Sequence, residues 1–258
     1  MTKPQVKALF EFLSASLSRQ GYKKVGDILA AEAYLANDPR ASQYMWAAEN
    51  YWFAFYGQPD EQNAWGWQFG GHHLAVNLAF DKGRVTSLSP TFLGTEPAIF
   101  TLDGLSYEVI TDLHHAGNKL FQSLNAKQKK QATYPKDFPD DVLTSAGKDD
   151  VTPEAEGIKG SDMNANQKAL LLEAIRGWVM VQPKENADKR MKHIEAEIDK
   201  LRFTWKGDNQ VNTPGYYRIQ GPDLIIELLS TGNISQDTEG GGHYHTIYRV
   251  PSLNYGGD

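Results

Sequence analysis

Cysteine is absent from this 258-residue chain, and its absence limits the chemistry that the protein can carry out. Without cysteine there are no disulfides, no thiolate metal ligands and no cysteine nucleophile. A chain of this length does not need such covalent links, because it is long enough to bury a large hydrophobic core. The cysteine content therefore leaves the cellular compartment open.

Long apolar runs and long basic runs are also missing. Apolar runs such as residues 169–172 and 224–226 are far shorter than the roughly 20 residues of a membrane-spanning helix. A net charge of −6 argues against a nucleic-acid surface, which needs clustered lysines and arginines. Residues 1–20 lack the apolar centre of a signal peptide. As the chain stands, we expect a cytoplasmic protein that binds neither membranes nor nucleic acids, with export of a precursor left open.

Several familiar catalytic motifs are absent as well. The chain contains no G-x-S-x-G nucleophile elbow, no G-x-x-x-x-G-K-[ST] phosphate loop, no G-x-G-x-x-G after a strand and no H-E-x-x-H. The common nucleotide-binding and serine-hydrolase classes are therefore disfavoured.

What the chain does contain is a series of helical and strand-like blocks. Apolar residues recur at helical spacing in four segments, residues 6–35, 103–132, 164–181 and 184–201. Alternation of period two predicts a hairpin over residues 74–88 and strands over 216–219, 224–229 and 244–250. Residues 133–160, rich in proline, glycine and charge, predict a long surface loop. We predict an α+β fold in which helices pack on an antiparallel or mixed sheet.

The two strand-rich parts of the chain align with each other at an offset of 150 residues. Identical residues at this offset are Phe53 and Phe203, Gly57 and Gly207, Gly71 and Gly221, Leu74 and Leu224, and Leu78 and Leu228. The pattern predicts a single domain, residues 1–258, made of two similar helix-plus-hairpin halves around a pseudo-twofold axis. The halves are residues 1–132 and 161–258, joined by the loop 133–160. A functional cleft is expected at the axis.

Histidines follow two diglycines and mark the most promising site. His72 and His73 come directly after one diglycine, and His243 and His245 follow the other. Residues two apart on a strand project from the same face, so His243 and His245 form a chelating pair. On a regular strand His73 shares its face with Asn77, which makes it a better ligand candidate than His72. A bulge at the diglycine would reverse that choice.

Glu227 is the acidic residue expected to complete this set, because it lies in the middle of an otherwise apolar strand. Imidazoles and a carboxylate together suit one divalent transition metal, and they do not distinguish zinc, copper, iron and manganese. Glu96 is a second choice. The structural alternative is that the histidines are simply hydrogen-bonded and that Glu227 pairs with Arg218 or Arg249.

Four segments of the chain resemble the DUF3500 family, a domain of unknown function common in bacteria. They are residues 65–77 (WGWQFGGHHLAVN), 90–98 (PTFLGTEPA), 216–227 (YYRIQGPDLIIE) and 243–251 (HYHTIYRVP). The resemblance extends from about residue 21 to residue 258, and it departs after Glu227, where residues 229–232 (LSTG) replace an Asp-Asn-Thr-Gln-like run. It supplies no reaction. It implies as site residues His72, His73, Glu96, Tyr217, Arg218, Gln220, Glu227, His243, His245 and Arg249.

These observations lead to a metal-dependent enzyme, hydrolytic rather than redox, as the leading hypothesis. His73, His243 and His245 would hold the ion, and Glu227 would complete its shell or act as general base on a bound water. Arg218 or Arg249 would orient a small polar or anionic substrate. One alternative is a non-catalytic protein that binds a small ligand in the same cleft. Another is a structural domain without a metal.

Overall fold

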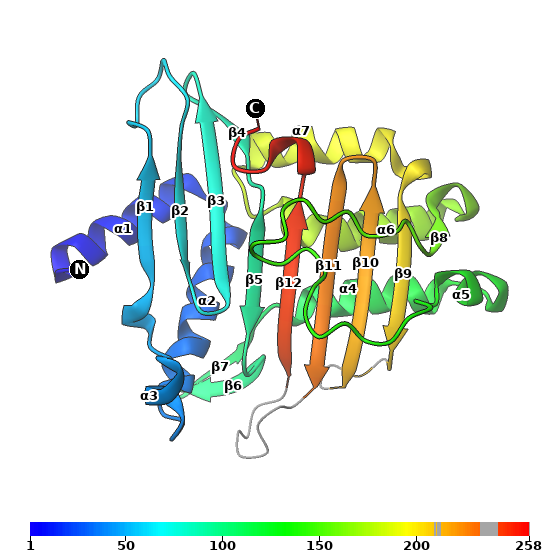
Figure 1. The fold of residues 1–258 in the computed structure, drawn as a ribbon, viewed down its shortest axis with the longest axis horizontal. Coiled ribbons are helices and arrows are strands. Elements are labelled where there is room, and N and C mark those ends of the chain that lie inside the picture. Colours follow the sequence, from blue (N-terminus) through cyan, green and yellow to red (C-terminus); the bar gives the residue numbers. More distant parts are fainter. Residues whose placement is uncertain (209, 211–212, 233–241, 258) are drawn as a thin grey trace.

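The computed structural model describes residues 1–208, 210, 213–232 and 242–257 (Figure 1). Residues 233–241, in the loop where the sequence departs from the family pattern, lie outside the described residues.

A ten-stranded sheet forms the centre of the described structure, and the pairings between its strands are antiparallel. The strand order is β1-β2-β3-β5-β12-β11-β10-β9-β8, with β4 paired to β3. The strands are β1 (Trp52–Tyr56), β2 (Trp65–Gly71), β3 (Leu74–Asp81), β4 (Arg84–Ser87), β5 (Thr91–Thr95), β8 (Ile158–Lys159), β9 (Arg202–Gly207), β10 (Pro214–Gly221), β11 (Leu224–Gly232) and β12 (His243–Arg249). A separate hairpin pairs β6 (Ile99–Leu102) with β7 (Leu105–Glu108).

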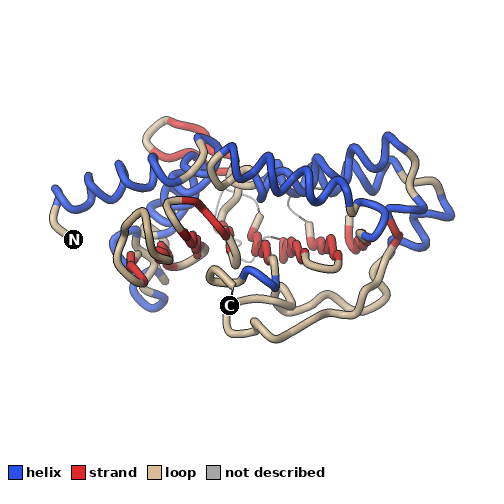
Figure 2. The backbone as a smooth tube through the Cα atoms, turned by 90° about the horizontal axis from the view of Figure 1, so that it is seen from above, coloured by secondary structure: helices blue, strands red, loops and turns tan. Residues whose placement is uncertain are grey.

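Helices cover one face of the sheet, and extended chain crosses part of the other face (Figure 2). The helices are α1 (Lys3–Ser16), α2 (Arg19–Leu35), α3 (Ala41–Tyr44), α4 (Thr111–Ser123), α5 (Ala126–Ala132), α6 (Ala165–Val179) and α7 (Lys184–Ala196). Short 3-10 turns are η1 (Ala48–Asn50), η2 (Gly160–Asp162), η3 (Ile198–Lys200) and η4 (Pro251–Leu253). The predicted α+β class, with an antiparallel sheet packed by helices, is confirmed.

Aromatic side chains fill the layer between the helices and the sheet. Phe12 of α1 makes edge-on contacts with Phe53 of β1 and Trp67 of β2, with ring centroids 5.5 and 5.7 Å apart. At the other end, Trp178 of α6 packs edge-on against Tyr217 of β10. Contacts of this kind stabilise a core beyond the free energy gained from area burial. We therefore expect the functional side chains on the opposite face of the sheet, which the helices leave free.

The hairpin predicted over residues 74–88 is confirmed as β3 and β4. Lys82 and Gly83 form its turn and have positive φ angles of 49° and 69°. Two successive left-handed residues are the geometry that matches the twist of paired strands, and glycine adopts it without strain.

The helix predicted over residues 103–132 begins later than expected and is interrupted. Residues 99–108 form the hairpin β6–β7 instead, with Asp103 and Gly104 in its turn at φ angles of 51° and 78°. An Asp-Gly pair favours this turn over a helix start. The helical part is divided at Asn125, whose side chain accepts a hydrogen bond from the backbone of Gln128 and starts α5.

Residues 134–157, here called the strap, cross the sheet face that the helices leave free. In Figure 1 the strap runs in front of β12, β11, β10 and β9 as a green trace. The prediction of a long loop in this part of the chain agrees with the structure, apart from β8 at its end.

Among the described residues, no helix is both long enough and apolar enough to cross a lipid bilayer.

Candidate metal centre

His72 and His73 form the two-residue turn between β2 and β3, which corrects the expectation that they lie on a strand. The last paired residues of the hairpin are Gly71 and Leu74. His73 has a left-handed backbone, with a φ of 60°. Gly71 is required here, because a Cβ at this position would lie 2.7 Å from the ring of Tyr51. The backbone of this turn, and not the alternation of a strand, therefore determines which of the two histidine side chains points to the site.

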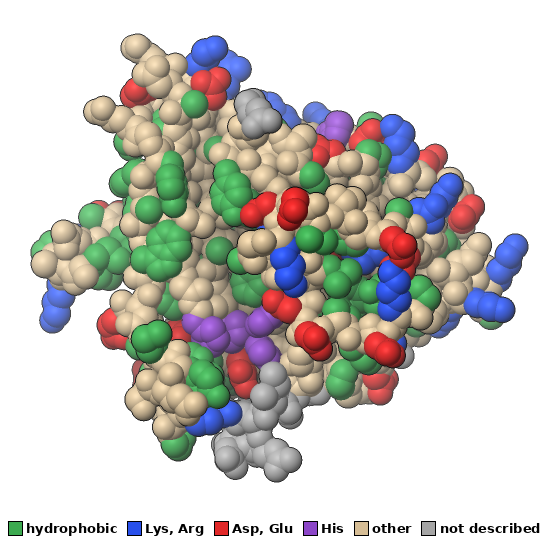
Figure 3. Space-filling model, in the orientation of Figure 1, with side chains coloured by type: hydrophobic (Ala, Val, Ile, Leu, Met, Phe, Trp, Pro, Cys, Tyr) green, Lys and Arg blue, Asp and Glu red, His purple; other side chains and the backbone are tan. Residues whose placement is uncertain are grey.

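Three imidazoles from the two histidine clusters meet on the sheet face opposite the helices. Nε2 of His243 lies 3.1 Å from Nε2 of His73 and 3.0 Å from Nε2 of His245. His243 and His245 project from one face of β12, as their spacing predicts. They reach His73 because β5 lies between β12 and β3 and pairs with both. Figure 3 shows the histidines as one purple patch on this face.

Gly94 of β5 makes room for this meeting. It is paired with His245 across the sheet, and a Cβ at position 94 would lie 2.9 Å from Cδ2 of His73. Any larger residue would push the His73 ring away from the other two. The glycine therefore belongs to the site, although it bears no ligand atom.

The other ring nitrogens of two of these histidines have partners that orient the rings. Nδ1 of His245 donates a hydrogen bond to Oδ1 of Asp141 in the strap, over 2.8 Å. Nδ1 of His243 is hydrogen-bonded to Oγ1 of Thr231, over 3.1 Å. A proton held on Nδ1 leaves Nε2 as a bare lone pair, which is the tautomer that metal-binding histidines use.

At these distances two neighbouring Nε2 atoms can share a proton in a hydrogen bond, or, where both carry lone pairs, they can bind a cation between them. Nitrogen ligands at 2.0–2.1 Å from a tetrahedral ion lie roughly 3.3 Å from one another. The separations of 3.0 and 3.1 Å are close to that spacing. The three histidines, with ligand atoms all within 4.8 Å of one another, form a group that fits a metal ion.

Burial keeps His73 and His243 neutral. It lowers the pKa of His73 well below its ordinary value, and the neighbouring histidines lower it further. Burial, with smaller effects from His245 and His72, also lowers the pKa of His243 to about 3. For Asp141, burial raises the pKa, but the hydrogen bonds that it accepts from His245 and from the backbone of Val142, together with nearby positive charge, lower it overall. Neutral imidazoles beside an ionised carboxylate are the protonation states that a divalent cation requires.

His72 lies at the rim of the cluster with a carboxylate of its own. Its Nδ1 donates to Oε2 of Glu32 over 2.9 Å, its ring stacks on Trp46, and its backbone carbonyl accepts a hydrogen bond from the Tyr51 hydroxyl. Glu32, His72 and His73 form a second group whose ligand atoms all lie within 4.8 Å of one another. His72 thus extends the histidine cluster toward α2.

Glu32, Asp141 and Thr231 are site residues that the sequence analysis missed. Glu32 could have been noticed because it lies on the largely apolar buried face of α2, where it is only 2% exposed. A buried carboxylate requires a partner. Nothing in the local sequence marks Asp141 or Thr231. They lie in a loop and at a strand end, and only the folded chain brings them to the histidines.

Glu96 is the predicted carboxylate that His72 and His245 influence electrostatically, although it belongs to neither group of possible metal ligands. It is buried, and burial raises its pKa, while Arg40, His72 and His245 act in the opposite direction. These influences place it within electrostatic reach of the cluster.

Glu227, in contrast, lies on the same sheet face but is hydrogen-bonded to other residues. Its carboxylate is 0% exposed and accepts four hydrogen bonds, from the backbone N–H groups of Leu143 and Thr144, the Thr144 hydroxyl and the Tyr216 hydroxyl. A carboxylate has about four acceptor positions, so these bonds fill it. In this structure Glu227 therefore binds the strap, and it is not among the grouped residues that could hold a metal ion.

The two arginines expected to orient a substrate also bind the strap. Arg249 donates to the carbonyl oxygens of Thr144 and Ser145 and to Asp149. Arg218 donates to the Glu154 carbonyl oxygen, to the Glu156 carboxylate and to the Tyr216 hydroxyl. Both guanidinium groups are buried, and these hydrogen bonds hold them in place, although Nε of Arg218 has no partner among the described residues. They are not free to meet an anionic substrate in this arrangement.

The remaining candidates lie away from the histidines. Nε2 of Gln220 donates to the Pro153 carbonyl oxygen in the strap. The Tyr217 hydroxyl donates to the Leu113 carbonyl oxygen on the helix side of the sheet. Nδ2 of Asn77 donates to the Pro90 carbonyl oxygen. The structure therefore separates the sequence candidates into a histidine centre, a set of strap contacts and single polar contacts.

An antiparallel sheet with helices on one face and a histidine cluster on the other defines the class: an α+β protein with a candidate metal centre. Within that class, the chain belongs to the family described as protein of unknown function (DUF3500), whose family model matches residues 1–257. The resemblance seen in the sequence is thereby confirmed over essentially the whole chain. Comparison with curated proteins and with solved structures finds no match.

Proposed function

We propose that His73, His243 and His245 bind one divalent transition metal and that the protein is a metal-dependent hydrolase. The observation that carries the proposal is the meeting of three imidazoles, in which Nε2 of His243 lies 3.1 Å from Nε2 of His73 and 3.0 Å from Nε2 of His245. It is supported by hydrogen bonds to Nδ1 of His243 and His245, which fit the tautomers that a metal needs. The donor set of three imidazoles is consistent with zinc, copper, iron or manganese.

Hydrolysis is favoured by the number and charge of the ligands. Three neutral imidazoles leave the positive charge of an ion uncompensated and leave coordination positions for water and substrate. A divalent ion held in this way lowers the pKa of a bound water, which supplies a nucleophile at neutral pH. Asp141 positions His245, and Glu96 is the nearby carboxyl group that is suited to exchange a proton with that water.

Elemental analysis of the untagged protein tests the metal-binding part of this proposal. We expect close to one transition-metal ion per chain after exposure to zinc, copper, iron and manganese salts. The His243→Ala and His245→Ala variants should lose it, because each removes one of three ligands. His193→Ala is the matched control, since this exposed histidine of α7 lies outside both candidate groups.

A metal content near zero, or equal metal in all variants, contradicts the metal site. The hydrolytic part has its own test, in which p-nitrophenyl esters and phosphate esters are assayed with metal-loaded and metal-free protein. Hydrolysis that requires the metal and is lost in His245→Ala supports the proposal. A protein that binds the metal yet hydrolyses none of these esters favours the second candidate function, a non-catalytic ligand-binding protein.

We also infer that the chain is one domain of two related halves. The strand registers support this, because they repeat at an offset of 150 residues. Phe53 pairs with Phe69 as Phe203 pairs with Ile219, and Gly71 pairs with Leu74 as Gly221 pairs with Leu224. The two sets of strands meet at the antiparallel pair β5–β12, where a twofold axis would lie. The metal centre beside this pair would then lie near the axis.

A further inference from the structure

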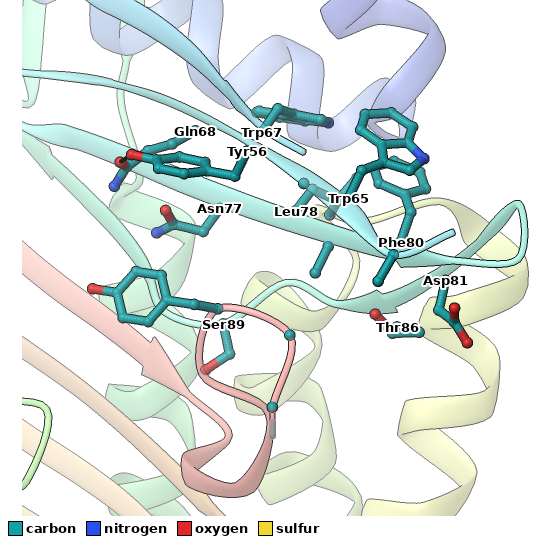
Figure 4. A pocket seen from close by; sticks show the side chains of 16 residues that line it. Tyr56, Trp65, Trp67, Gln68, Asn77, Leu78, Phe80, Asp81, Thr86 and Ser89 are labelled. Carbon is teal, nitrogen blue, oxygen red and sulfur yellow. Dashed lines mark hydrogen bonds between the residues drawn. The ribbon is translucent and has the colours of Figure 1, made fainter. Parts of the chain in front are cut away.

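A groove of about 740 Å³ lies on the face of β2 and β3 that the helices leave free (Figure 4). Its lining includes β1, β2, β3 and the C-terminal turn that contains Tyr255, Gly256 and Gly257. This volume is typical of small-molecule sites. The groove lies on the same sheet face as the histidine centre, but its lining residues include none of the histidines.

Two amide side chains stand together on the groove floor. Gln68 and Asn77 are cross-strand partners, and Figure 4 shows them side by side, with Trp67 pointing to the helices instead. Asn77 is only 7% exposed. Its Nδ2 is bound to the Pro90 carbonyl oxygen, but its Oδ1 accepts no hydrogen bond from the described residues. An acceptor that faces a cavity and has no protein partner is available to a polar ligand.

Gln68 offers the complementary group. Its Oε1 accepts a hydrogen bond from the Tyr56 hydroxyl over 3.1 Å, while its Nε2 has no partner among the described residues. One free donor and one free acceptor therefore lie on neighbouring strands, about 5 Å apart at their Cβ atoms. Two adjacent hydroxyl groups of a ligand match this pair, because each hydroxyl both donates and accepts.

The walls of the groove are aromatic and its floor is made of small residues. Tyr56 and Tyr255 line it, and each is 58% exposed. Gly66 and Ala79 form part of the floor, so the ligand can approach the sheet backbone. Flat aromatic walls suit a ring that has apolar C–H faces and a polar rim.

Charge narrows the ligand class further. Among the described residues that line the groove there is no lysine or arginine, and Asp81 is the single carboxylate. A phosphate or carboxylate ligand would find no cation there to balance it. The lining therefore favours an uncharged ligand.

The strap gives a useful contrast on the other half of the same face. There, Tyr216, Arg218 and Glu227 of β10 and β11 are bonded to strap residues or to one another, and the strap covers them. Among the described residues, no hydrogen bond joins Gln68 or Asn77 to the strap, and the groove beside them is bordered by the C-terminal turn.

We propose that this groove binds a neutral, polyhydroxylated ligand of the saccharide class. Gln68 and Asn77 bind adjacent hydroxyl groups, and Tyr56 and Tyr255 contact the faces of the sugar rings. The proposal goes beyond the metal centre and does not depend on it, because none of these groups is a metal ligand.

Isothermal titration of EDTA-treated protein with neutral tetrasaccharides tests the proposal. The probes are glucan, xylan, mannan and N-acetylglucosamine tetrasaccharides, with a galacturonate tetrasaccharide as the charged comparison. We expect at least one neutral probe to bind and the galacturonate to bind more weakly. Tyr56→Ala and Gln68→Ala should each raise the Kd of the bound probe about tenfold, a loss of one aromatic contact or hydrogen bond.

Tyr44→Ala is the matched control, because Tyr44 is similarly exposed and lies outside the groove. It should leave the Kd unchanged, and circular dichroism should show that all three variants are folded. The proposal is overturned if no neutral probe binds at millimolar concentration, or if the galacturonate binds best. It is also overturned if Tyr56→Ala and Gln68→Ala bind as the wild type does.

Discussion

Asp141 is a residue outside the proposed ligand set that would position one of the ligands of the proposed metal centre. It accepts the Nδ1 proton of His245 and so fixes the nitrogen that faces the other histidines. Asp141→Asn keeps the shape but removes the charge that holds this tautomer. We expect a 10–100-fold loss of metal affinity, the typical effect of removing such a partner. Competition with a fluorescent metal chelator measures it.

The control for this prediction is Asp137→Asn in the same strap, at an aspartate whose side chain is fully exposed. Equal affinities of the Asp137→Asn and Asp141→Asn variants would show that Asp141 does not position His245.

His114 makes a prediction about acid stability that is separate from the metal centre. It is 1% exposed in α4, and neither ring nitrogen has a hydrogen-bond partner among the described residues. Burial lowers its pKa from 6.5 to about 4. The folded state therefore resists protonation. The stability contributed by neutral His114 is complete above pH 6.5 and decreases as the pH falls from 6.5 toward 4.

This shift corresponds to about 2 kcal/mol of unfolding free energy lost by pH 5. In His114→Leu that part of the pH dependence should disappear. Urea unfolding of both proteins at pH 7.5 and pH 5 gives the comparison. If the variant loses as much stability as the wild type between these pH values, His114 is not the responsible group.

At the scale of the elements, the strap is attached to the sheet through a buried carboxylate. Four groups bind the Glu227 carboxylate, three of them from the strap residues Leu143 and Thr144. Glu227→Gln places an NH₂ group against N–H donors and leaves a buried group unsatisfied. We expect a loss of about 1–3 kcal/mol in unfolding free energy and faster proteolysis within residues 134–157.

The metal content of Glu227→Gln distinguishes a role of Glu227 in binding the strap from the role as a metal ligand that the sequence predicts. In Glu227→Gln the metal should remain, since Glu227 is not among the grouped ligands. Glu154→Gln serves as the control, because this exposed strap carboxylate contributes little to stability. Loss of the metal in Glu227→Gln without loss of stability would return Glu227 to the metal shell.

Local sequence patterns predicted most of the helices and strands. They failed where two turns occur close together. The β3–β4 hairpin was predictable because alternation and a glycine turn agree. The β6–β7 hairpin was missed because apolar residues after it suggested a longer helix, although Asp103-Gly104 is itself a turn signal. His72 and His73 were placed on a strand for the same reason. A two-residue turn interrupts the alternation from which their directions were inferred.

At the scale of the whole molecule, the convergence of distant histidines depends on the pairing of β5 with β12. The chelating geometry of His243 and His245 followed from their spacing alone. Their meeting with His73 was an assumption in the sequence analysis, because strands 150 residues apart leave no local sign of their pairing. The contacts of Glu227, Arg218 and Arg249 with the strap could not be predicted for the same reason, since they are long-range contacts.

The shared sheet also predicts how the molecule unfolds. Strands from both proposed halves are neighbours in one sheet, and apolar side chains from both belong to one core cluster. We therefore expect a single cooperative transition in urea, with coincident curves from tryptophan fluorescence and far-UV circular dichroism. Two separated transitions would contradict a single domain and would show that each half is stable on its own.

Crystallography with anomalous scattering tests the metal centre most directly. Crystals of the metal-loaded protein, measured on both sides of the absorption edge of the bound element, show where that element lies. The account predicts one anomalous peak about 2.0–2.3 Å from Nε2 of each of His73, His243 and His245. The absence of a peak among these three nitrogens, with the rings in the same positions, would contradict it.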